Sequence, residues 1–139
     1  MRKVFVVASA LVLALLLAAC TPEEADHLKA VNDFRGYLGL PALAWNEQAY
    51  GPARAWSQHM ADAGALSHPS DLAANFGLPA GWHKLGQNVA VATTLDAAMA
   101  ALEKSPPHWE NLTDRAYTQV AVGVVQQGGR YWITEDFVG

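Results

Sequence analysis

The sequence contains a single cysteine, Cys20, among 139 residues. One thiol cannot close an intramolecular disulfide, so the stability of the fold must come from a packed core. Basic residues are also few: nine Lys and Arg against thirteen Asp and Glu give a formal net charge of −4. This acidic balance argues against nucleic acid as a partner and against electrostatic docking on anionic lipid.

Common catalytic signatures are missing as well. The sequence has no His-Glu-x-x-His pair, no Gly-x-Ser-x-Gly elbow, no phosphate-binding glycine loop and no cysteine besides Cys20. The residue pattern by itself therefore indicates no familiar enzyme class.

One long, largely apolar run is present, at the N-terminus. Arg2 and Lys3 precede it, and it ends in Leu17-Ala18-Ala19-Cys20, which resembles a bacterial lipobox. We expect residues 1–19 to be a lipoprotein signal peptide, residues 20–26 to hold the lipidated Cys20 and a short tether, and residues 27–139 to form one domain. The protein would then be extracytoplasmic and attached through acylated Cys20 to the cell membrane or the outer membrane. A transmembrane anchor is the alternative, but the run is short for a bilayer core of about 30 Å.

The remaining residues predict helices followed by a β-hairpin. Thr21 and Asn46 are favourable helix caps, Gly64 is a helix stop, Pro106-Pro107 should end a later helix, and Gly128-Gly129 is a hairpin turn. Capping residues and apolar periodicity together predict helices over 22–38, 47–63, 71–76 and about 95–104, and strands over 87–92, 117–125 and 130–138. This order indicates an α+β domain.

Four short motifs occur in a fixed order. They are Gly64-Ala65-Leu66-Ser67-His68, Leu85-Gly86-Gln87-Asn88-Val89, Ser105-Pro106-Pro107-His108-Trp109-Glu110-Asn111-Leu112 and Arg130-Tyr131-Trp132-Ile133-Thr134-Glu135-Asp136-Phe137. Together they resemble the CAP superfamily of cysteine-rich secretory proteins, antigen 5 and pathogenesis-related class 1 proteins, and especially its short bacterial SCP-like members. The resemblance spans about residues 28–137. It implies an α-β-α sandwich in which helices flank a central antiparallel sheet.

The resemblance also implies a cleft in which two histidines and two acidic residues can bind a divalent metal, usually zinc. His68 matches the first histidine, but Gln87 stands in place of a glutamate, Ala116 in place of the second histidine, and Ser105 near the second acidic position. An amide carries no charge and is a poor zinc ligand or general base. We therefore expect no cofactor, with Zn²⁺ bound by His68 and His108 as the exception to be tested.

Seven residues are expected at or near this cleft: His68, Gln87, Asn88, Ser105, His108, Glu110 and Asn111. Asn88 matches a family asparagine that we expect to hold neighbouring backbone. Trp82 and Trp109 are expected on opposite rims, where their rings would stack on a sugar or clamp an acyl chain. The other histidines, His27, His59 and His83, have no ligand spacing and are expected at the surface or in interfaces.

The pattern favours a non-catalytic, lipid-anchored domain. Its cleft would bind a small apolar or glycan-like ligand or an envelope protein. Two alternatives remain open: a divalent-metal-dependent hydrolase that uses His68, His108 and Glu110, and a structural spacer in the cell envelope.

Overall fold

The computed structural model describes residues 20–139, so the predicted signal peptide lies outside the described residues. Within that range, none of the helices combines the length and the apolar character needed to cross a membrane. The elements, in chain order, are α1 (Pro22–Tyr37), β1 (Ala44–Trp45), α2 (Glu47–Ala63), α3 (Leu72–Phe76), β2 (Leu85–Ala92), α4 (Leu95–Lys104), α5 (Pro106–Thr113), β3 (Gln119–Gln127) and β4 (Arg130–Val138).

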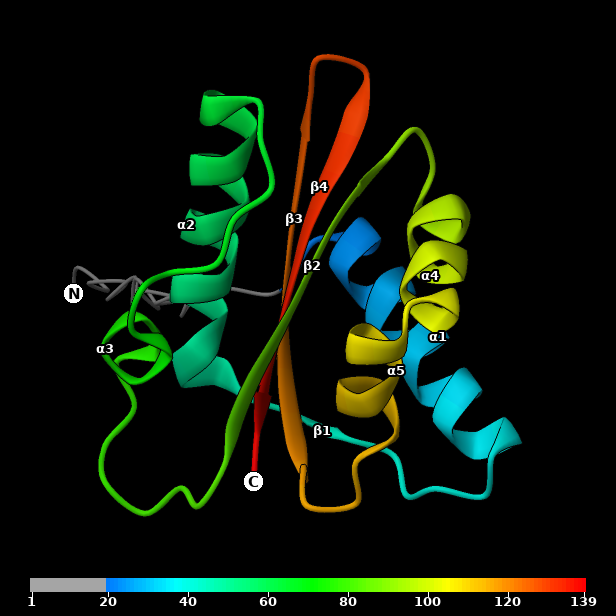
Figure 1. The fold of residues 1–139 in the computed structure, drawn as a ribbon, viewed down its shortest axis with the longest axis vertical. Helices are drawn as coiled ribbons and strands as arrows, with labels where there is room; N and C mark the ends of the chain where they lie inside the picture. The colour runs from blue at the N-terminus through cyan, green and yellow to red at the C-terminus, as the bar shows by residue number, and fades with distance from the viewer. Residues whose placement is uncertain (1–19) are drawn as a thin grey trace, which may run out of the picture.

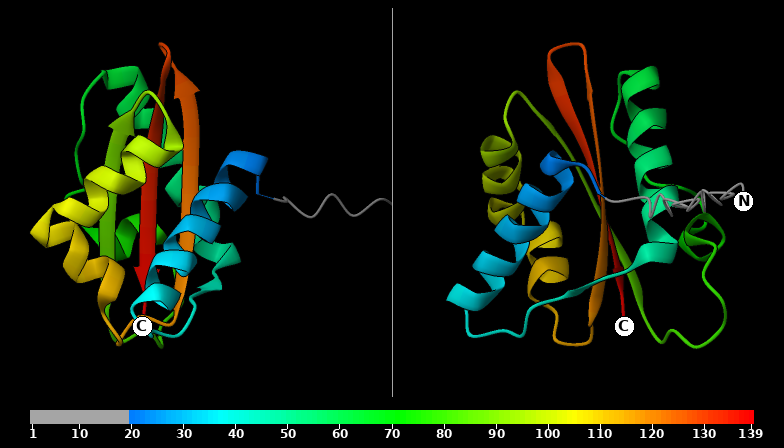
Figure 2. Two further views of the ribbon diagram at one scale, coloured as in Figure 1. Left: turned by 90° about the vertical axis from the view of Figure 1, so that its right-hand side faces the viewer. Right: turned by 180° about the vertical axis from the view of Figure 1, so that it is seen from behind.

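The elements form three layers. Helices α2 and α3 lie on one face of the sheet, and α1, α4 and α5 lie on the other (Figures 1 and 2). The strand order is β1-β3-β4-β2, with β4 antiparallel to both of its neighbours. The predicted α-β-α sandwich is therefore confirmed. The two-residue strand β1, which the sequence did not predict, pairs in parallel with the start of β3, and β2 forms the opposite edge.

Local signals in the sequence explain where the first helices begin and end. Thr21 and Glu24 form a capping box at the start of α1, which satisfies two of the exposed N–H groups of its first turn. The Asn46 side chain caps α2, and Gly64 ends it in the left-handed conformation with φ 67°. Residues 22–26 thus belong to α1, and Glu24 is buried. The folded domain therefore begins before residue 27, the boundary that we expected from the sequence.

Helix α5 was not predicted. Pro106 and Pro107 end α4, as expected, but they also occupy the first turn of α5, where proline is tolerated because its missing N–H group needs no partner. The α5 helix carries His108 and Asn111 back against β2. The second half of the third motif is therefore helical and packs on the sheet.

The two faces of the sheet are packed differently. The larger apolar core lies under α1, α4 and α5 and includes Val31, Leu102, Leu112, Val122, Ile133 and Phe137. On the other face, α2 lies directly on β3. A Cβ atom on Gly123 would come within 2.4 Å of the Ala53 carbonyl carbon. Gly123 is therefore needed for this close approach of helix to strand.

Candidate functional site

A mainly apolar cleft lies at the outer edge of β2. Its volume is about 160 Å³, and its walls come from the loop after α2, from β2 itself and from α4 and α5. The lining residues are Leu66, Val89, Ala90, Val91, Ala101, Leu102, Ser105 and His108. Of the predicted cleft residues, Ser105 and His108 therefore line this hollow directly.

A chain of hydrogen bonds links His68 to the sheet. The Nδ1 atom of His68 lies 2.8 Å from Oε1 of Gln87, and Nε2 of Gln87 donates to Oδ1 of Asp136 at 2.8 Å. When Asp136 is ionised, the Gln87 nitrogen must face the carboxylate and its oxygen must accept from Nδ1 of His68. The Nε2 atom of the exposed His68 ring is then free to accept a hydrogen bond from a ligand.

Asp136 was not among the expected site residues. Its side chain is fully buried, and its Oδ2 atom has no hydrogen-bond partner in the described part of the chain. Burial raises the pKa of Asp136 to about 7. The hydrogen bond from Gln87 acts against this rise, and the charge of Glu135 adds to it. Asp136 pairs with Gln87 on the neighbouring strand β2. An alignment of the two predicted strands in this register would have placed Asp136 at the site.

His108 supplies a neutral imidazole to the cleft. Burial lowers the pKa of His108; the charge of Glu135 acts against this effect and the charge of His68 adds to it. Its buried Nδ1 atom has no hydrogen-bond partner among residues 20–139. An uncharged imidazole that lines the cleft can hydrogen-bond the polar end of a ligand without requiring that ligand to be charged.

The opposite face of β2 carries a second, buried polar cluster. Asn88 donates to Oε2 of Glu135 at 3.0 Å and to the backbone oxygen of His108 at 3.2 Å. The Asn111 side chain donates to Oδ1 of Asn88 at 2.9 Å. Asn88 and Asn111 therefore hold α5 on the sheet and position His108, and neither side chain faces the cleft.

His27 belongs to this buried cluster, and our expectation of a position at the surface or in an interface was wrong. Its Nε2 atom lies 2.7 Å from Oε1 of Glu135, and both side chains are buried. The sequence did hold a signal, because residues 24, 27 and 31 share one face of a 3.6-residue helical repeat. Glu24 and Val31 are also buried.

The structure does not bring Glu110 together with the other two proposed hydrolase residues, His68 and His108. Glu110 is exposed and does not line the cleft. Gln87 separates His68 from the carboxylate of Asp136. Within residues 20–139, no group of three or more His, Cys, Asp and Glu side chains is placed to hold a metal ion. The residues present therefore do not fit the family's zinc site.

The two tryptophans expected to face each other lie in different places. Trp109 packs edge-on against Phe34 of α1, with ring centroids 5.2 Å apart. Trp82 lies in the loop before β2 and lines a different hollow, described below. The prediction of one clamp formed by both rings was wrong, because Trp109 packs on α1 whereas the loop that holds Trp82 comes from the α2 and α3 side of the sheet (Figure 1).

The sequence matches the family model described as "CAP: Cysteine-rich secretory protein family" over residues 28–137, and the protein therefore belongs to this family. No curated protein matches the sequence.

Solved structures of bacterial proteins share its fold. An extracellular SCP-domain protein from Bacillus anthracis has a TM-score of 0.72 and 24% identity, covering 86% of this chain and 44% of that one. An outer surface protein from Borrelia burgdorferi has a TM-score of 0.75 and 13% identity, covering 86% of this chain and 95% of that one. A cysteine-rich secretory protein from Staphylococcus aureus has a TM-score of 0.70 and 15% identity, covering 84% of this chain and 38% of that one. The chain thus spans less than half of the Bacillus and Staphylococcus proteins.

Proposed function

We propose that this protein is a lipid-anchored, extracytoplasmic CAP domain that binds a short apolar chain in the cleft at the β2 edge. The observation that carries this proposal is the lining of the cleft: apolar side chains from three segments, with the imidazole of His108 at one wall. Each methylene group buried there would contribute about 0.8 kcal/mol. The imidazole of His108 would hydrogen-bond the polar end of the ligand.

The same lining argues against a glycan in this cleft. Sugar hydroxyls need several hydrogen-bonding partners, whereas Ser105 and His108 are the only polar side chains among the eight lining residues. It also favours binding over hydrolysis, since Gln87 is uncharged and Glu110 lies elsewhere. A domain that served only as a spacer would have no need of such a cleft.

The position of Cys20 supports the anchor. Its side chain is partly buried and packs against the small core cluster of Ala49, Tyr50 and Ala53 on α2. Helix α1 begins two residues later. An acylated Cys20 would therefore hold the folded domain directly at the bilayer surface, with no flexible tether. Loss of labelling by an alkyne-palmitate analogue in Cys20→Ser cells would support the anchor; unchanged labelling would contradict it.

Ligand binding can be tested by thermal unfolding of the domain over residues 21–139 in the presence of octanoate. A ligand that binds only the native state raises its stability, by about 2.7 kcal/mol at a hundred times the Kd. Ala101→Phe should fill the cleft and abolish the rise in Tm. Ala97→Phe is the matched control, because Ala97 is also exposed on α4 but does not line the cleft. A rise in Tm that both variants retain, or no rise in the wild-type protein, would contradict the proposal.

A further inference from the structure

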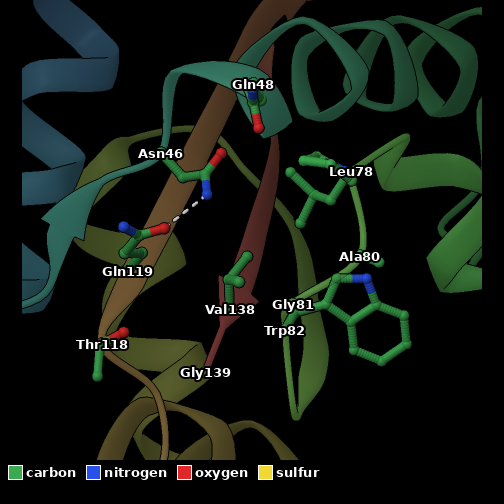
Figure 3. Close-up of a pocket in the computed structure, with 11 residues that line it drawn as sticks. Asn46, Gln48, Leu78, Ala80, Gly81, Trp82, Thr118, Gln119, Val138 and Gly139 are labelled. Atoms are coloured by element: carbon green, nitrogen blue, oxygen red, sulfur yellow. Dashed lines mark hydrogen bonds between the residues drawn. The ribbon is translucent and has the colours of Figure 1, made fainter.

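A second hollow lies at the end of the sheet where β3 begins and β4 ends. Its volume is about 300 Å³, and α2, the loop before β2 and the two strand ends line it. Figure 3 shows Gln48 pointing from the start of α2 toward Val138, with Gln119 and the Trp82 ring on opposite sides. An adjoining hollow of about 220 Å³ shares Asn46, Gln48 and Gln119 with it. We call the two together the amide groove, lined by Trp45, Asn46, Gln48, Trp82, Thr118 and Gln119.

We propose that the amide groove binds a neutral glycan. This proposal does not rest on the cleft at the β2 edge, because the two sites share no lining residue. The argument comes from the polar groups of the groove, from its charge and from its two indole rings.

The polar groups of the groove are partly ordered and partly unused. Asn46 accepts from the backbone N–H of Ala49 at 2.8 Å and donates to Oε1 of Gln119 at 2.7 Å. This second bond leaves Nε2 of Gln119 without a partner in the described residues. The Gln48 amide and the Thr118 hydroxyl likewise make no hydrogen bond within residues 20–139. Three neutral side chains therefore offer spare donors and acceptors around one fixed amide pair.

The charge of the groove argues against an anionic ligand. Neither hollow has a lysine or arginine in its lining, so an anionic ligand would find no cation. The one charged lining side chain is Glu47, which accepts from the Trp45 indole N–H at 2.8 Å. An acyl chain would fit poorly as well, because it would leave the spare amide groups unpaired.

The indole rings supply the apolar part of the site. Trp82 is 38% exposed in a loop, which is unusual for so large an apolar side chain. Trp45, at the other end of the groove, is held by packing on Tyr50 with ring centroids 5.1 Å apart. A sugar ring has an apolar C–H face and a polar rim, so indoles beside neutral amides match it. An N-acetylated sugar fits best, because its acetamido group pairs with an amide side chain.

The test is a titration of chitotriose, a neutral trisaccharide of N-acetylglucosamine, into the ¹⁵N-labelled domain over residues 21–139. We expect chemical-shift changes at the Trp82 indole N–H and at the side-chain amides of Gln48 and Gln119. Trp82→Ala should weaken binding about tenfold, the scale expected for one aromatic contact. Gln48→Ala should weaken it several-fold. Tyr37→Ala is the control, because Tyr37 is an aromatic residue on α1 that is 87% exposed.

The outcomes separate this site from the cleft. Shifts confined to the amide groove, with an affinity that falls in both groove variants but not in the control, would support the proposal. The absence of shifts at millimolar chitotriose, shifts at Leu66 and His108 instead, or unchanged affinity in Trp82→Ala and Gln48→Ala would overturn it. Gln48 lies on an exposed turn of α2, so its substitution tests the site without disturbing the core.

Discussion

Asp136→Asn is expected to remove a pH dependence from the stability of this domain. The pKa of Asp136 is raised from 3.8 to about 7, chiefly by burial. Between these two pH values, the folded protein keeps a proton that the unfolded chain has released. The free energy of unfolding therefore falls as the pH rises from about 4 to about 7, and this contribution is constant above that range.

The size of the effect follows from the shift. A change of about three pH units at 1.36 kcal/mol per unit sets an upper limit of about 4 kcal/mol on the loss. Asparagine cannot ionise, so the variant avoids this loss. Its amide nitrogen would occupy the place of Oδ2, which has no partner in the described chain. An unpaired buried donor costs about 1–3 kcal/mol at every pH. Relative to wild type, the variant should thus gain up to about 3 kcal/mol of stability between pH 5 and pH 8.

Urea unfolding followed by tryptophan fluorescence at pH 5, 6, 7 and 8 measures this difference. Burial lowers the pKa of His108, so His108 lowers the free energy of unfolding as the pH falls. This contribution is the same in both proteins and cancels in the comparison. Asp33→Asn is the control, because the Asp33 side chain is 64% exposed. Its free energy of unfolding should follow the wild-type pH profile. If the profiles of wild type and Asp136→Asn run parallel from pH 5 to pH 8, the reasoning about Asp136 is refuted.

Three further predictions concern packing and charge. Glu24→Gln should lower the free energy of unfolding in urea by about 2–4 kcal/mol, because the buried carboxylate accepts hydrogen bonds from Thr21, which caps α1, and from α2 and β3. A loss below about 0.5 kcal/mol would contradict this. Gly123→Ala should destabilise the domain by about 2 kcal/mol or more, because the new Cβ atom would meet Ala53 of α2. Gly36→Ala, whose Cβ atom would have nothing within 4 Å, should instead stabilise α1 by about 1 kcal/mol. Equal changes in Tm for the two variants in calorimetry would be inconsistent with this packing. His68→Ala should change stability by less than about 1 kcal/mol, because His68 is exposed and makes one side-chain hydrogen bond; a larger loss in urea would mean that the ring supports the fold.

The sequence predicted those parts of the fold whose signals are local. Thr21, Asn46 and Gly64 act within one turn of the helix ends that they define, and Gly128-Gly129 joins β3 to β4 as expected. The prolines after α4 were harder to interpret, because Pro106 and Pro107 can end one helix and begin the next. Strand β1 is too short for periodicity to reveal it.

The candidate site depended on contacts between distant residues. His27 and Glu135 are 108 positions apart, and no local pattern links them. The register of β4 on β2 decides that Asp136 lies beside Gln87 and Glu135 beside Asn88, and a shift of one residue would exchange the two faces. Trp82 was expected at the cleft because it precedes β2 in sequence, yet its loop lies at the far end of the strand, beside the amide groove.

The central claim is that the cleft at the β2 edge binds a short apolar chain. The most direct test is an NMR titration of the ¹⁵N-labelled domain with octanoate. The account predicts saturable chemical-shift changes at the backbone amides of Val89, Val91 and Leu102, together with a change at the ring of His108. Changes centred on Trp82 and Gln48, or no change up to millimolar octanoate, would contradict it.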